Sequence, residues 1–309
     1  MKGRYENMNK NNKLVLLGGD LRQYTASVML GQMGYDIQMF GVYGAKENTD
    51  TSIFGAEYEE ALSKANAVVL PLPVSPDGIY LNCPFLNGRE KLRLTEILKF
   101  INLNTVIVGG RVPMGFGKEA EERGFLVKDY FESEDFQIQN AYITAEAALS
   151  IAMNSLDKNI CGSKIAITGY GRIAKHLERL LLGLGAEVTV AARKDSDLAW
   201  AYSHGCTVLK IGNGEEKGNI YKLTDGYDVI YNTVPNRLFD EDFLKQAKGS
   251  TYIIDLASVP GGVDIRAAKE LGSNVLWAAS LPGKYAPKSA GVLIASCVSG
   301  ILQGEGVCP

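Results

Sequence analysis

The sequence predicts an α/β protein of two doubly wound, Rossmann-like parallel-sheet domains with a cleft between them. Short apolar segments alternate with helical segments in both halves of the chain, as in parallel sheets covered by helices. The second half opens on a strand, a glycine turn and a helix at residues 164–174, the pattern of a dinucleotide site. A length of 309 residues with 46% apolar content suffices for two domains, each with its own core.

The first half of the chain alternates strands with helices. Strands are expected near Lys13–Leu17, Asp36–Phe40, Ala67–Leu70, Thr105–Val108 and Phe125–Lys128. Helices are expected near Leu21–Met33, Glu57–Lys64, Glu90–Phe100 and Gly117–Arg123. This order predicts a parallel sheet with helices on both faces.

A connecting helix at 138–157 is expected next, because Ile138–Leu156 is rich in Ala, Met, Leu and Ile and contains no Gly or Pro. The strands of the second half are expected near Lys164–Thr168, Glu187–Ala191, Thr207–Leu209, Asp228–Asn232, Tyr252–Asp255 and Asn274–Leu276. A last helix from Pro287 to about Ile301 is expected to return to the first domain. We therefore expect a domain of residues 1–140 with 286–309 and a nucleotide domain of 141–285, joined by hinges at Asn140–Ala145 and Gly283–Pro287.

The turn after the strand Lys164–Thr168 carries the nucleotide signature. Gly169 permits a tight turn, Gly171 lets the backbone approach a pyrophosphate, and Ala174 lets helix and strand pack closely. The helix N-terminus offers N–H groups to the anion. The neighbouring residues Tyr170, Arg172 and Ile173 complete the predicted cofactor contacts. The alternative is a tight turn that needs glycine for structural reasons alone.

The residues after the next strand predict which nicotinamide cofactor is bound. An Asp or Glu there holds the ribose 2′-hydroxyl of NAD, whereas a basic residue receives the 2′-phosphate of NADP. The chain has Arg193 and Lys194 at this point, and the first carboxylate comes at Asp195. We therefore predict NADP, bound by Arg193 and Lys194. The alternative is that both belong to an ordinary solvated loop.

Loops after later strands of the second domain are short and rich in Gly, Pro, Ser and Thr, which suits backbone contact with a nicotinamide ribose. The cofactor contacts expected from these loops are Thr233, Val234, Pro235, Ala257, Ser258 and Leu281. Asp255 ends a buried strand, where we expect it to orient a loop or cap a helix.

The first domain has no such signature, because its turn Gly18-Gly19-Asp20 lacks the Gly-x-Gly spacing. Ligands of open α/β sheets lie outside the carboxyl ends of the strands. Asp20, Arg22 and Gln23 therefore fall on the ligand side and are candidate substrate contacts. The alternatives are a helix N-cap for Asp20 and a solvated first-turn residue for Arg22.

Composition excludes several classes of partner. The net charge is −3 and no block of like charges occurs, so we expect no nucleic acid and no anionic membrane as partners. Residues Met1–Lys13 are polar, and no apolar run approaches the ~20 residues of a membrane span, so a cytoplasmic protein is expected. Five scattered cysteines without a CxxC motif predict neither disulfides nor a metal site.

Two late segments carry a resemblance to a known family. They are Asp255-Leu-Ala-Ser-Val-Pro-Gly-Gly-Val-Asp264 and Leu281-Pro-Gly-Lys-Tyr-Ala-Pro-Lys-Ser-Ala-Gly291. With Gly18–Asp20, Leu70–Ser75, the Gly169 turn and Ala192-Arg193, in this order, the chain resembles the family of dipicolinate synthase A subunits over most of its length. Arg111 lies outside the resembling segments.

The resemblance implies a function in sporulation, on a branch from lysine biosynthesis in the mother cell. It implies oxidation of dihydrodipicolinate, or of its hydrated precursor, to dipicolinate with hydride transfer to NADP. Because the product ring is aromatic, the protein mainly has to align the substrate with the cofactor. The resemblance also implies a flavoprotein-like partner, the B subunit of dipicolinate synthase, and we expect a homo-oligomer.

Substrate residues are sought among groups that can bind two carboxylates. Arg22, Ser75, Arg111 and Thr144 are candidate anchors, with Arg22 the leading one because arginine binds carboxylates in a bidentate manner. Lys288, at the start of the last helix, is the candidate for moving a proton, or else a solvated lysine. His176 and His204 are the two histidines of the chain, and neither is well placed for catalysis.

Two other functions remain open. One is a different NADP-dependent dehydrogenase of similar shape, acting on a small keto or hydroxy acid as shikimate and alanine dehydrogenases do. The other is a nucleotide-binding protein whose active site a second protein completes. Reduction of NADP by the isolated chain with dihydrodipicolinate distinguishes them.

Overall fold

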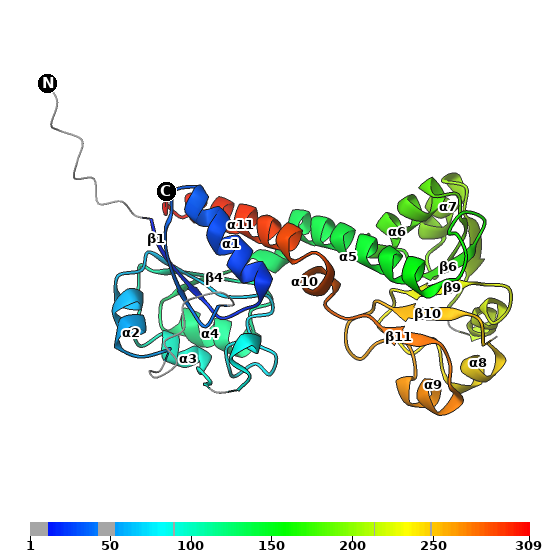
Figure 1. The fold of residues 1–309 in the computed structure, drawn as a ribbon, viewed down its shortest axis with the longest axis horizontal. Coiled ribbons are helices and arrows are strands. Elements are labelled where there is room, and N and C mark those ends of the chain that lie inside the picture. The colour runs from blue at the N-terminus through cyan, green and yellow to red at the C-terminus, as the bar shows by residue number, and fades with distance from the viewer. Residues whose placement is uncertain (1–11, 43–52, 89, 213, 248) are drawn as a thin grey trace, which may run out of the picture. The chain divides into compact units, whose positions relative to one another are not determined.

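The computed structural model describes residues 12–42, 53–88, 90–212, 214–247 and 249–309. The polar stretch up to residue 11, for which no signal peptide was expected, lies outside these residues. The chain divides into two compact units. Unit 1 consists of Met1–Gln139 and Ala286–Pro309, and unit 2 of Asn140–Tyr285. Each unit is an α/β layer structure (Figure 1).

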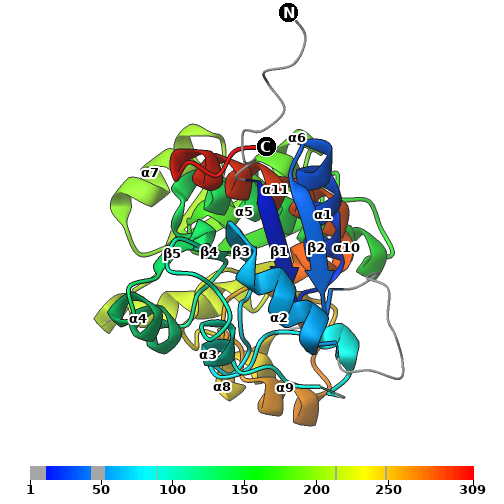
Figure 2. The same cartoon turned by 90° about the vertical axis from the view of Figure 1, so that its left-hand side faces the viewer.

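Unit 1 contains a five-stranded parallel sheet in the order β2-β1-β3-β4-β5, which Figure 2 shows side by side. Its strands are β1 (Lys13–Leu17), β2 (Asp36–Phe40), β3 (Ala67–Val69), β4 (Val106–Gly109) and β5 (Leu126–Asp129). Its helices are α1 (Leu21–Gln32), α2 (Ala56–Ser63), α3 (Leu94–Ile97), α4 (Met114–Glu122) and α11 (Pro287–Gly304), with 3-10 turns at Pro84–Leu86 and Tyr130–Glu132. The strand order reverses between β1 and β3.

Helices cover both faces of this sheet. Buried side chains of α2, α3 and α4 pack on one face, with Tyr58, Leu62, Ile97 and Phe116 at the centre. Helices α1 and α11 lie side by side on the other face (Figures 1 and 2). Their close approach requires Gly291, because a Cβ there would lie 2.6 Å from the carbonyl oxygen of Arg22.

One predicted helix of unit 1 is wrong in its extent. Helix was expected over Glu90–Phe100, but only Leu94–Ile97 is α-helical. The residues before it are extended, because Leu92 accepts a hydrogen bond from the backbone of Leu81 and Arg93 bridges to Tyr80. Pairing with this distant segment outweighs the local helix propensity of the Lys-Leu-Arg-Leu sequence.

Unit 2 contains a six-stranded parallel sheet in the order β11-β10-β9-β6-β7-β8. Its strands are β6 (Lys164–Thr168), β7 (Glu187–Ala192), β8 (Thr207–Lys210), β9 (Val229–Asn232), β10 (Tyr252–Asp255) and β11 (Val275–Trp277). Its helices are α6 (Arg172–Gly183), α7 (Asp195–Ser203), α8 (Glu241–Gln246), α9 (Ile265–Leu271) and α10 (Leu281–Tyr285), with a 3-10 segment η3 (Gly214–Leu223). Helix α5 (Glu134–Ser155) begins in unit 1 and continues into unit 2.

The sheet of unit 2 lies between two apolar layers. Helices α5, α6 and α7 contribute to one core, whereas η3, α8 and α9 contribute to the other. The strand order reverses between β6 and β9, as in dinucleotide-binding sheets. The prediction of two parallel-sheet α/β domains is confirmed, and the cleft stays a prediction. Within the described residues, no helix has both the length and the apolar character needed to cross a membrane.

Candidate functional site

The turn after β6 is shaped by a glycine in the left-handed region. Gly169 has φ +83°, and its N–H donates to the carbonyl oxygen of Ala191 at 2.8 Å. A Cβ at this position would lie 2.6 Å from Thr233 Oγ1. Both backbone conformation and space therefore exclude other residues, as the sequence predicted for the tight turn.

The start of helix α6 is open toward a ligand. Gly171 is its N-cap, and the described residues supply no side-chain hydrogen bond to this cap. A Cβ at Gly171 would meet no described atom within 4 Å. Ala174 is fully buried, which brings helix and strand close together. An α-helix N-terminus of this kind, next to free space, can bind a phosphate group.

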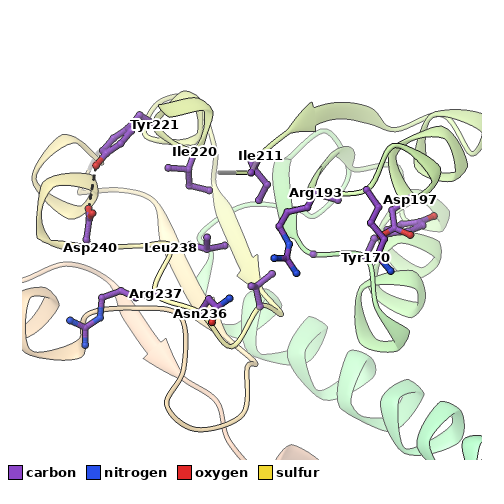
Figure 3. Close-up of a pocket in the computed structure, with 15 residues that line it drawn as sticks. Tyr170, Arg193, Asp197, Ile211, Ile220, Tyr221, Asn236, Arg237, Leu238 and Asp240 are labelled. Carbon is purple, nitrogen blue, oxygen red and sulfur yellow. Dashed lines mark hydrogen bonds between the residues drawn. The ribbon is translucent and has the colours of Figure 1, made fainter. Parts of the chain in front are cut away.

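A cavity of about 310 Å³ lies beside this turn (Figure 3). Figure 3 shows the Arg193 side chain extending into it, between Leu238 and Tyr170. Arg237 points away and pairs with Asp264 at 3.2 Å. The cavity is lined by Gly169, Tyr170, Ala192, Arg193, Lys194, Asp197, Ile211, Gly212, Ile220, Tyr221, Val234, Asn236, Arg237, Leu238 and Asp240. Five of the residues predicted to contact a cofactor are among them: Gly169, Tyr170, Arg193, Lys194 and Val234.

The charges at the end of β7 favour an anion. Arg193 and Lys194 are exposed at the cavity. The first acid of the segment, Asp195, forms an ion pair with Lys210 at 2.5 Å. That pair occupies one carboxylate oxygen of Asp195 with a cation, so its negative charge is partly compensated. Asp197, in the first turn of α7, is half-buried and lines the cavity.

A buried polar network lies under the loops at the carboxyl edge of this sheet. Thr168 donates to Asn232 Oδ1 at 2.6 Å, and Asn232 Nδ2 donates to Asp255 Oδ1 at 2.7 Å. Asp255 also accepts from the backbone N–H groups of Ala257 and Gly262, at 3.1 and 2.8 Å. Asp255 therefore orients a loop, one of the two roles expected for it. The network ties the ends of β6, β9 and β10 together.

The other predicted cofactor residues do not line the cavity. The Thr233 hydroxyl instead donates to the carbonyl oxygen of Thr168 at 2.7 Å. Ser258 is exposed, and Leu281 is only 2% exposed and packs in the apolar core. Four more, Gly171, Arg172, Ile173 and Pro235, lie in the neighbouring turn, the first turn of α6 and the loop after β9. Ala257 is buried, and its N–H belongs to the Asp255 network.

The structure brings Asp20, Arg22 and Gln23 together at the carboxyl edge of unit 1. Asp20 is the N-cap of α1, and its Oδ2 accepts from Arg22 Nη2 at 2.8 Å. The same Nη2 donates to the carbonyl oxygen of Leu72 at 2.6 Å. Gln23 Nε2 donates to the carbonyl oxygen of Val69, whereas its Oε1 has no hydrogen-bond partner among the described residues. Arg22 is thus buried and already paired with a carboxylate.

The other predicted substrate residues are engaged locally. Ser75 Oγ donates to Asp77 and accepts from the backbone of Gly78 in an exposed turn. The Arg111 guanidinium lies 4.4 Å from the centre of the Phe131 ring. Thr144, in unit 2, donates to the carbonyl oxygen of Asn140 at 2.8 Å. Lys288 is exposed in the first turn of α11.

Glu178 was not expected at the site, yet the structure buries it beside the Gly169 turn. Its side chain contacts Tyr170, His204 and Cys206. An acid inside an amphipathic helix is usually a surface residue, so only the partners reveal its burial. Among the described residues, no cluster of three His, Cys, Asp or Glu side chains could hold a metal ion.

Comparison with known proteins finds similarity to dipicolinate synthase A subunits and, at the level of the fold, to a dehydrogenase. Residues 13–131 match the model of the N-terminal domain of the dipicolinate synthase A subunit. The A subunit of dipicolinate synthase from Bacillus subtilis (strain 168) is 28% identical over 291 residues, covering 94% of this chain and 95% of the relative. The crystal structure of the A subunit of the same enzyme from Bacillus halodurans has a TM-score of 0.80 at 26% identity, covering 96% of this chain and 99% of that one. D-lactate dehydrogenase of Escherichia coli shares the fold at 14% identity, with a TM-score of 0.57 and coverage of 95% and 98%.

Proposed function

We propose that the chain, which is similar over most of its length to dipicolinate synthase A subunits, oxidises dihydrodipicolinate, or its hydrated precursor, to dipicolinate with NADP as hydride acceptor. The single observation that supports nucleotide binding most strongly is the open N-terminus of α6. There Gly171 leaves space where another residue would place a side chain. A pyrophosphate fits this position, because it is anionic and can accept the first N–H groups of the helix.

The cavity beside the turn supports the proposal that the adenosine end of the nucleotide binds there. Ile211, Ile220 and Leu238 provide apolar surface for an adenine ring. Arg193 supports NADP over NAD, because its guanidinium can pair with a 2′-phosphate in a bidentate manner. The Asp195–Lys210 ion pair adds to this argument, since that acid is engaged elsewhere.

Oxidation of dihydrodipicolinate removes one hydride and one proton from the ring and forms an aromatic product, and the hydrated precursor must in addition lose one water. The bound cofactor supplies the hydride acceptor. The chain has to align the two rings and exclude water, and the network of Asp255 supports this role by fixing three loops at one edge. We assign the departing proton to Lys288 or solvent, and the substrate carboxylates to the carboxyl edge of unit 1.

We also propose the partners that the family relationship suggests. The flavoprotein-like B subunit of dipicolinate synthase accompanies the chain, and the complex acts in the mother-cell cytoplasm. Self-association of the chain stays a prediction. The alternative of a nucleotide-binding protein completed by this partner is supported by Arg22, whose pairing with Asp20 limits its use as a substrate anchor.

The test is a titration followed by an activity measurement. Purified chain is titrated with NADP and with NAD by calorimetry, and then mixed with NADP and freshly prepared dihydrodipicolinate while absorbance of reduced nucleotide is recorded. We expect tighter binding of NADP and formation of NADPH together with dipicolinate. Binding without turnover, restored by the flavoprotein-like partner, supports the completed-site alternative. Absence of binding of both nucleotides contradicts the proposal.

A further inference from the structure

The middle residue of the turn, Tyr170, is anchored to a buried carboxylate. Its hydroxyl donates to Glu178 Oε2 at 2.6 Å, and the two residues are 6% and 2% exposed. Burial first, and the hydrogen bond to Glu178 second, raise the pKa of Tyr170. The hydroxyl therefore keeps its proton and remains a donor at neutral pH. A short hydrogen bond between two buried side chains is among the stronger single contacts of a protein.

The other oxygen of Glu178 is bound from a different part of the chain. Its Oε1 accepts from Cys206 Sγ at 3.3 Å and lies 3.2 Å from His204 Nδ1. His204 follows α7, and Cys206 precedes β8. One carboxylate thus joins the Gly169 turn and α6 to the connection between α7 and β8. Glu178 needs these partners, because a buried carboxylate without hydrogen bonds is strongly unfavourable.

Tyr170 also borders two cavities. It lines the 310 Å³ cavity that contains Arg193, and it lines a second cavity of about 480 Å³. The second cavity is bordered by Glu178, His204 and Trp200 as well. The ring is therefore a wall of the candidate nucleotide site, and the Glu178 hydrogen bond fixes its position from behind.

We propose that Glu178 is a positioning residue for the nucleotide, acting through Tyr170 on the turn that receives the pyrophosphate. This inference rests on the proposed nucleotide binding. Without the hydrogen bond, the turn between Gly169 and Gly171 has more conformations in the free protein, and binding has to order it. Affinity then falls although no residue that touches the phosphate has changed.

The experiment compares variants that remove the bond with one that preserves an acceptor. Tyr170→Phe keeps the ring and removes the donor, Glu178→Leu removes the acceptor, and Glu178→Gln retains an oxygen. We expect the first two to weaken NADP binding about 10-fold and Glu178→Gln to stay within about threefold of the parent, from the strength of a buried hydrogen bond whose acceptor oxygen Gln retains. Tyr227→Phe, which loses a hydroxyl contact to Thr189 in the same unit, is the matched control and should bind as the parent does.

A second measurement does not depend on nucleotide. Amide hydrogen exchange of residues 169–173 in the free protein should accelerate in Tyr170→Phe and remain unchanged in Tyr227→Phe. Unchanged exchange and unchanged affinity in Tyr170→Phe, with a parent that binds NADP, overturn the positioning role alone. A parent that binds neither NADP nor NAD overturns the proposed function and this inference with it.

Discussion

Units 1 and 2 both begin with a strand, a glycine turn and a helix, but their turns differ in what occupies the space at the helix start. In unit 1 the carboxylate of Asp20 caps α1, and a Cβ at Gly18 would lie 2.6 Å from the carbonyl oxygen of Asn82. In unit 2 the cap of α6 is Gly171, beside which the described residues leave open space. The same geometry therefore becomes an anion site only where the protein supplies no anion of its own.

The two sheets also differ at the point where their strand order reverses. In unit 1, where the order reverses between β1 and β3, the Arg22 side chain after β1 donates to the carbonyl oxygen of Leu72 after β3. In unit 2, Asn232 and Asp255 join the strand ends underneath, and the space above the turn remains accessible. At this edge of unit 1, Asp20 and Arg22 thus contact each other and the backbone, whereas a cavity lies beside the corresponding turn of unit 2.

The largest expected effects come from replacing the glycine of each turn, Gly171 in unit 2 and Gly18 in unit 1, with valine. Gly171→Val should weaken NADP binding more than about 100-fold, because the branched side chain fills the phosphate position. Stability should hardly change, since a Cβ there meets no described atom. Gly18→Val should instead destabilise the fold by about 2–4 kcal/mol, through its positive φ and the clash with Asn82. Calorimetry and thermal unfolding measure both, and undiminished NADP binding by Gly171→Val contradicts the site.

The ion pair of unit 1 provides the next test. Arg22→Ala leaves Asp20 and the Leu72 carbonyl oxygen without this partner, so we expect a loss of about 2–3 kcal/mol of unfolding free energy. Lys288→Ala, at an exposed position, should change stability by less than about 0.5 kcal/mol. Both variants should bind dipicolinate more weakly in the presence of NADP and bind NADP nearly as the parent does. If dipicolinate affinity is unchanged in both, the substrate is bound elsewhere.

The preference of unit 2 for NADP over NAD tests the role of Arg193. Arg193→Asp should reduce the preference for NADP over NAD by about 1.5–3 kcal/mol, the strength of a hydrogen bond to a charged group. Parallel titrations with the two nucleotides give this difference directly. Arg266→Asp is a suitable comparison, because Arg266 is exposed on α9 and is not among the residues that line the cavity. Equal affinity of the parent protein for both nucleotides would show that Arg193 does not select NADP.

A smaller effect is expected in cysteine labelling, which reports on the two turns separately. Burial raises the pKa of both Cys83, beside the Gly18 turn, and Cys206, under Glu178, to about 12. At pH 8 both thiols are therefore almost entirely protonated and should react slowly, whereas exposed Cys161 and Cys308 should react faster. NADP should slow labelling of Cys206 about fivefold and leave Cys83 unaffected. Mass spectrometry of timed samples measures both rates, and equal slowing of the two thiols contradicts the distinction between the units.

The sequence predicts the sheets well because strand periodicity and glycine turns are local signals. The expected bounds of β1, β6 and β10 agree with the structure, and the Gly169 turn has the predicted conformation. The short helix α3 was overestimated, since residues before it pair with a distant segment. Glu178 was missed for a related reason: its burial depends on Cys206, which lies 28 residues further along the chain. Contacts between distant segments leave no periodic pattern in the sequence.

Because α11 belongs to unit 1 but follows unit 2 in the sequence, unit 2 can finish folding before unit 1 during synthesis. Helix α11 buries Ala290, Ile294 and Val298 in unit 1, yet it is translated after the whole of unit 2. Unit 2 is continuous in sequence, so it can complete its core while unit 1 still lacks a helix against α1. The apolar side of α1 must stay uncovered on the ribosome for the time needed to make 140–285. We therefore expect unit 1 to complete its core only after unit 2 has been synthesised.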